Sequence, residues 1–179
     1  MDSQREWKEF CFTEVFTDIK RGKRLKKADH DEGDIPYVSS TGLNNGVDGF
    51  IGNSKNVRIF DDCITLANSG SVGSAFFHRY KFVASDHVTK LKNSKINQYA
   101  YLFMLPIINR LSEKYSFNRE INDERIKREK FLLPVTADGV PDWQYMEEYM
   151  HQKEQAILKP AVEKLCWRII NNNLLPPPE

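Results

Sequence analysis

The sequence predicts an α+β fold, in which a twisted mixed or antiparallel sheet with flanking helices is followed by a C-terminal helical arm. Seven of the nine glycines lie between Gly33 and Gly73, among short segments rich in β-branched and aromatic residues. A helical spacing of apolar residues begins at Asn97, and a second begins after a turn at residues 138–142. We therefore expect one domain over residues 1–142 and an arm over residues 143–179.

The first ninety residues are expected to form mainly strands. Trp7–Phe12 has a strand pattern, and Thr13 is placed to cap a short helix that runs to Ile19. Asn45-Gly46 and Asp48-Gly49 are dipeptides typical of hairpin turns, because asparagine, aspartate and glycine tolerate positive φ. The further predicted strands are Ile35–Val38, Val47–Ile51, Val57–Phe60, Ile64–Ala67, Ala75–His78 and Val88–Leu91.

Helices are expected to follow. Asn97–Leu111 has helical periodicity, and Pro106 should kink or end this helix. Asn122–Arg128 predicts a second, very polar helix, and Phe131–Val135 closes the domain as an apolar edge segment.

The arm is predicted to be an amphipathic helix that begins after Asp142, a good N-cap. Its apolar residues step by 4, 3 and 4, the spacing of a coiled-coil seam: Leu158, Val162, Leu165 and Ile169. Pro160 should bend or split this helix, and Asn171–Glu179 should be a frayed end. The stripe must be covered, either by its own domain or by a second copy or partner helix.

Composition excludes several classes of protein. Apolar residues make up 40% and charged residues 28% of the 179 residues, which argues against a disordered or fibrous chain. No apolar stretch approaches the roughly 20 residues that a membrane-spanning helix needs, and the charged first residues do not form a signal peptide. Cys11, Cys63 and Cys166 lie far apart, which favours free thiols in a reducing cytoplasm.

The net charge of +1 conceals an uneven distribution. Residues 136–179 carry four basic and seven acidic groups, whereas Ile19–Ala28 carries six basic residues and no acid. Arg79–Lys95 has five basic residues against one acid. A single charge run is often only a solvated surface, but two in one domain favour a polyanionic partner.

Motifs for catalysis are missing from the sequence. It has no nucleotide-binding glycine motif and no nucleophile elbow, so Asn68–Ser74 is either a tight connection or a loop whose backbone approaches a phosphate. Asp86 and His87 are adjacent and would point to opposite faces of a strand. The acidic turn at residues 29–34 should be solvated, so we expect no metal and no cofactor.

Two polar loops offer groups that read nucleic-acid bases. Ser39–Gly46 carries hydroxyls and amides, and Tyr115–Glu120 carries Asn118 and Arg119. Asparagine pairs with adenine and arginine with guanine, although loops of this composition also occur as ordinary turns.

A series of segments in order resembles one target recognition domain of a type I restriction-modification specificity subunit. It includes Trp7–Phe10, Gly33–Ser40, Asn44–Val47, Asp61–Gly73, Phe82–Val88, Phe131–Val135 and Gly139–Met146. The resemblance implies a non-catalytic reader of double-stranded DNA that directs a methyltransferase subunit, and through it a restriction subunit, to its site. The family's usual subunit carries two such domains, and this chain has the length for one, so it is expected to be a half-subunit, a fragment or a solitary domain. A homodimer is the expected assembly.

Composition, rather than the resemblance, supplies the candidate contacts. Those expected to hold phosphates are Lys20, Arg21, Lys23, Arg24, Lys26, Lys27, Arg79 and Lys81. Those expected to read bases are Ser39, Ser40, Thr41, Asn44, Asn45, Asn118 and Arg119. Two alternatives remain: a module that binds only protein, and a small nuclease or hydrolase that uses Asp86, His87 or the acidic turn.

Overall fold

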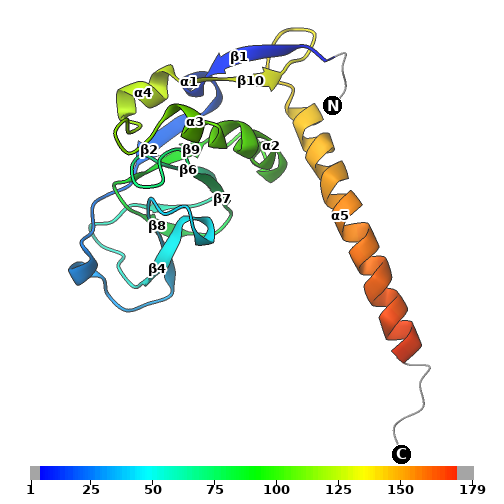
Figure 1. The fold of residues 1–179 in the computed structure, drawn as a ribbon, viewed down its shortest axis with the longest axis horizontal. Coiled ribbons are helices and arrows are strands. Elements are labelled where there is room, and N and C mark those ends of the chain that lie inside the picture. The colour runs from blue at the N-terminus through cyan, green and yellow to red at the C-terminus, as the bar shows by residue number, and fades with distance from the viewer. Residues whose placement is uncertain (1–4, 173–179) are drawn as a thin grey trace, which may run out of the picture.

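A computed structural model describes residues 5–172, and Figure 1 shows a body of strands and short helices from which one long helix projects. The centre of the body is a four-stranded antiparallel sheet in the order β2-β9-β6-β7. Its strands are β2 (Asp18–Arg21), β9 (Val88–Lys92), β6 (Cys63–Ala67) and β7 (Ala75–His78).

Helix α2 (Gln98–Asn109) covers one face of this sheet. It begins where Asn97 accepts hydrogen bonds from the backbone N–H groups of Tyr99 and Ala100. Tyr101, Met104 and Ile108 are buried on it, together with sheet residues such as Ile64 and Leu91, in the main hydrophobic core. This burial of a helical stripe on an apolar sheet face is the main source of stability in the body.

A second four-stranded sheet has the order β4-β3-β8-β5 and is mixed, because β3 and β8 run parallel. Its strands are β4 (Val47–Ile51), β3 (Ile35–Val38), β8 (Phe82–Ala84) and β5 (Ile59–Phe60). A smaller cluster that includes Val38, Phe82 and Cys63 packs the two sheets together.

The two ends of the body meet in a third, two-stranded sheet. In it β1 (Trp7–Cys11) pairs with β10 (Lys130–Pro134). The short helices of the body are α1 (Phe12–Val15), η1 (Lys27–Asp29), η2 (Asn44–Gly46), α3 (Leu111–Lys114) and α4 (Asp123–Arg128).

Helix α5 (Trp143–Asn172) leaves the body after Asp142, whose carboxylate accepts a 3.0 Å hydrogen bond from the backbone N–H of Tyr145. Its first turns pack on α2: Met146 is fully buried and the Tyr99 hydroxyl donates to Glu154 at 2.8 Å. From residue 155 to residue 170 every side chain is exposed, and this part of the helix extends away from the body. None of the helices in the described range 5–172 is long and apolar enough to cross a membrane.

The α+β class is confirmed, but the strands divide among three sheets rather than one. The predicted helix from Thr13 to Ile19 is wrong: α1 ends at Val15, and residues 18–21 form β2 because Ile19 pairs with Leu91 of β9. Asp48-Gly49 is not a turn either, since both residues lie inside β4.

Of the two outcomes expected at each proline, an end of α2 at Pro106 and a split of α5 at Pro160 are wrong. Helix α2 continues past Pro106 to Asn109, and α5 passes Pro160 as one continuous helix. A proline removes one backbone donor, and water can satisfy the freed carbonyl where α5 is exposed. The predicted frayed end falls largely at residues 173–179, outside the described residues.

Candidate nucleic-acid interface

The basic segment Lys23–Lys27 is a loop that is held to the body by its backbone. The N–H groups of Gly22 and Lys23 donate to the carbonyls of Val88 and Ala84 at 2.8 and 3.0 Å. A Cβ at Gly22 would lie 2.1 Å from the Ser85 carbonyl oxygen, so only glycine fits this close approach. The loop is therefore fixed against the β8–β9 turn.

Leu25 divides this segment into an inner and an outer side. It packs against the cluster of Tyr37, Ile51 and Val83, while its basic neighbours on both sides point outward. Those neighbours are Lys23, Arg24, Lys26 and Lys27, and all four are exposed, with no ion pair to another residue in the described part of the chain. Their charges are free to meet an anionic partner.

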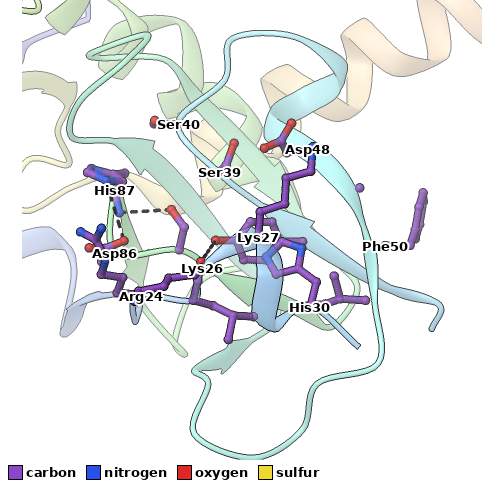
Figure 2. Close-up of a pocket in the computed structure, with 15 residues that line it drawn as sticks. Arg24, Lys26, Lys27, His30, Ser39, Ser40, Asp48, Phe50, Asp86 and His87 are labelled. Atoms are coloured by element: carbon purple, nitrogen blue, oxygen red, sulfur yellow. Dashed lines mark hydrogen bonds and ion pairs between the residues drawn. The ribbon is translucent and has the colours of Figure 1, made fainter. Parts of the chain in front are cut away.

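A cavity of about 300 Å³ lies beside this loop (Figure 2). Three of the predicted phosphate ligands and two of the predicted base readers line it together: Arg24, Lys26, Lys27, Ser39 and Ser40. Its wall also includes Phe50, Asp48, Asp86 and His87. The basic loop and the start of the first polar loop therefore form one surface, which also carries two acids.

The first polar loop is bonded to the glycine-rich loop 68–73. Ser71 donates its backbone N–H to the Ser40 carbonyl at 3.0 Å, and its hydroxyl accepts from the Gly42 N–H at the same distance. Gly70 has φ +61°, and a Cβ there would lie 2.7 Å from the Ser40 hydroxyl oxygen. Asn44 and Asn45 both have positive φ in the exposed tip of this loop.

The second polar loop meets the same glycine-rich loop. The Ile121 N–H donates to the Asn68 carbonyl at 3.0 Å, and a Cβ at Gly73 would lie 2.5 Å from the Ser112 nitrogen. We call residues 39–46, 68–73 and 112–121 the loop row. The structure thus brings both groups of predicted base readers into one contiguous set of loops.

A buried carboxylate anchors the start of the second polar loop. Glu129 is 4% exposed, accepts 2.8 and 3.0 Å hydrogen bonds from the Lys114 ammonium, and also accepts from the Tyr115 hydroxyl. Burial, followed by the hydrogen bond to Glu129, raises the pKa of Tyr115 to about 12. The phenol therefore stays protonated and remains a donor at neutral pH.

Asp86 and His87 lie in the turn between β8 and β9, not on a strand, and so the expectation of opposite faces is wrong. The His87 Nε2 lies 3.9 Å from the Asp86 carboxylate, and its Nδ1 lies 2.6 Å from the Ser69 hydroxyl. Ser69 is buried and does not line the cavity, so it offers no accessible nucleophile. These contacts connect the turn to the glycine-rich loop.

The remaining basic candidates lie outside this surface. Lys20 and Arg21 lie on β2, where the Arg21 guanidinium pairs with Asp123 at 3.1 Å. Arg79 and Lys81 are exposed in the turn between β7 and β8 and do not line the cavity. Across residues 5–172, no three or more His, Cys, Asp or Glu side chains form a group that could hold a metal ion.

Sequence reasoning missed the apolar side chains at the loop tips. Leu43 is 73% exposed and Phe117 is 76% exposed, each next to a predicted base reader. The sequence did contain a signal for them, since each is a large apolar residue within an otherwise polar loop. On α5, the stripe Leu158, Val162, Leu165 and Ile169 lies in the exposed half, with 48–58% of each residue accessible.

Comparison with known proteins shows what the chain is similar to. A family model described as the type I restriction modification DNA specificity domain matches residues 4–159. The chain is 38% identical over 160 residues to the type II restriction enzyme specificity subunit S.BcgI from Heyndrickxia coagulans, with 88% of the chain and 46% of that protein covered. The chain therefore spans about half the length of this relative.

Solved structures share the fold at low identity. The S subunit of a type I restriction-modification system from M. genitalium matches with a TM-score of 0.58 and 16% identity, over 98% of this chain and 47% of that one. The HsdS subunit from Thermoanaerobacter tengcongensis matches with a TM-score of 0.60 and 16% identity, over 90% of this chain and 41% of that one. A chain from a structure on complex assembly and conformational transition of the type I R-M system matches with a TM-score of 0.63 and 18% identity, over 92% of this chain and 43% of that one.

Proposed function

Because the chain belongs to the type I restriction modification DNA specificity domain family, we propose that it reads one short sequence in double-stranded DNA. The observation that carries this proposal is the loop row, which bears exposed amides and a guanidinium. Its Ser39 and Ser40 share a cavity with a loop whose four cations make no ion pair within residues 5–172. In such an interface, cations position the duplex through its phosphates, and side chains on base edges supply the sequence preference.

The roles divide along the surface. Lys23, Arg24, Lys26 and Lys27 would hold one stretch of phosphates, and Lys20, Arg21, Arg79 and Lys81 would hold phosphates farther along the duplex. The base readers would be Ser39, Ser40, Thr41, Asn44, Asn45, Asn118 and Arg119. The glycine-rich loop between them supports this division, since it hydrogen-bonds to both reading loops and fixes their spacing.

We propose that the chain is the non-catalytic specificity component of a restriction-modification system in the cytoplasm. A methyltransferase subunit, and through it a restriction subunit, would supply the chemistry. The burial of Ser69 and its position outside the cavity support this assignment over a hydrolase.

We also propose that residues 1–142 form the recognition domain and residues 143–179 the arm through which two copies associate. The exposed stripe of α5 supports this, because a soluble monomer rarely leaves such a face uncovered. A two-fold dimer would present two recognition domains, so its target would be an inverted repeat.

A salt series on the full chain with labelled duplex DNA tests this function and its alternatives. We expect affinity to fall steeply as salt rises, and unlabelled duplexes of different sequence to compete unequally. Binding that is absent, or flat with salt, would favour a module that binds only protein. Metal-dependent cleavage of the duplex that is lost in Asp86→Ala would favour a nuclease.

A further inference from the structure

Two large apolar side chains occupy the tips of the two reading loops. In the described chain before α5, Phe117 and Leu43 are the most exposed of the large apolar residues, at 76% and 73%. Single exposed apolar residues are common and need no explanation. Here the two most exposed residues, Phe117 and Leu43, lie on separate loops that are both hydrogen-bonded to the same glycine-rich loop.

Both tips are rigid. Ser116 and Arg119 exchange backbone hydrogen bonds of 3.3 and 2.8 Å, so Phe117 and Asn118 are the central residues of a tight turn. Two hydrogen bonds hold the ends of this turn: the Tyr115 hydroxyl donates to the Glu129 carboxylate, and the Ile121 N–H donates to the Asn68 carbonyl. In the other loop, Leu43 donates its N–H to the Thr41 hydroxyl at 3.2 Å and accepts from the Gly46 N–H at 2.8 Å.

Neither side chain contributes to folding, because it is nearly as accessible in the folded chain as in an unfolded one. A stiff turn that presents an uncovered apolar group is suited to contact with a partner, since little conformational entropy is lost on binding. The chemistry of that partner is indicated by the neighbouring residues. Each apolar tip is followed directly by an asparagine: Asn44 after Leu43, and Asn118 after Phe117.

An apolar group beside an amide matches one feature of the major groove. Across the major groove an A·T pair presents the adenine N7 and N6 amino group, then the thymine O4 and, at the far end, the thymine 5-methyl group. Asparagine bonds to the adenine N7 and N6 amino group, which leaves the methyl group of the same pair to an apolar neighbour. We propose that Leu43 and Phe117 read thymine methyl groups, so that each loop tip recognises an A·T pair through its apolar and amide side chains. This inference rests on the proposed function and adds two specificity-determining residues to it.

Uracil tests the contact directly, because it pairs like thymine and lacks only the methyl group. The full chain is used to enrich duplexes from a randomised library, and the enriched duplex is then made with deoxyuridine at one thymine position at a time. For the unmodified chain, one or more positions should cost about fourfold in affinity, the value of one buried methyl group. At those positions Leu43→Ala or Phe117→Ala should show no loss, while Val140→Ala, an equally simple truncation of an exposed residue away from the loop row, should behave as the unmodified chain does.

The outcomes separate this inference from the function on which it rests. Enrichment of one sequence whose affinity is unchanged by deoxyuridine at every position overturns the methyl contact and leaves sequence reading intact. If deoxyuridine lowers affinity equally in the unmodified chain and in both alanine variants, the methyl contact is likewise overturned and sequence reading stays intact. If no sequence is enriched, the proposed function fails, and the contact fails with it.

Discussion

Replacing Lys23, Arg24 and Lys27 by alanine should weaken DNA binding equally for all sequences and reduce its dependence on salt. The three side chains are exposed, and no ion pair within the described residues holds them, so their loss removes charge without breaking a contact that stabilises the body. The segment's anchors, the backbone of Gly22 and Lys23 and the side chain of Leu25, stay in place.

The magnitude follows from counterion release. Each phosphate contact adds about 0.9 to the slope of log K against log salt, so losing three contacts should flatten the slope by about 2.7. Raising salt from about 50 to about 200 mM should then weaken the unmodified chain about 40-fold more than the variant.

Fluorescence anisotropy of a labelled duplex over a salt series measures both slopes. The matched control replaces Lys95, Lys159 and Lys164, which are also exposed and without an ion pair inside the described range, but lie before α2 and on α5. An unchanged slope in the first variant, or equal flattening in the control, would refute the assignment of the segment to phosphate binding.

Two further predictions concern association and stability. Leu165→Asp should abolish the dimer, because two copies of a leucine lose about 1.5–3 kcal/mol each, while Ala156→Asp, at an exposed position off the stripe, should not; light scattering that shows the unmodified chain to be monomeric would contradict this. The pKa of buried His78 is lowered from 6.5 to about 4, mainly by burial, so the unfolded state binds more protons between those pH values. Stability should fall by up to about 3 kcal/mol as pH falls through this window and should vary less in His78→Gln, which denaturant unfolding measures; equal pH dependence in both would reject a neutral buried histidine.

The starts of α2, α4 and α5 were predictable because their signals are local, whereas α1 begins at Phe12, before the predicted cap Thr13. Asn97, Asn122 and Asp142 each accept a backbone hydrogen bond from the first turn that follows, as their types and positions predict. Strand β2 was missed because three of its four residues are charged, so the sequence shows no clear alternation of apolar and polar residues. Its one apolar residue, Ile19, is paired with Leu91 of β9, which lies far away in the sequence.

The loop row could not be predicted because its contacts join distant residues. Ser40 meets Ser71, and Asn68 meets Ile121, through backbone groups that carry no sequence signature. Sequence composition selected the residues with reading chemistry, while only the fold shows that their two segments share one support. It also shows that three of the phosphate candidates, Arg21, Arg79 and Lys81, lie outside the cavity.

The central claim is that the loop row determines which DNA sequence the chain binds. Residues 39–46 and 115–120 can be exchanged for those of another recognition domain of the same family, with the basic segment and the glycine-rich loop unchanged. Selection from a randomised duplex library then compares the sequences enriched by the two chains. We predict a different enriched sequence with a similar salt slope, whereas enrichment of the original sequence after both exchanges would contradict this role of the loop row.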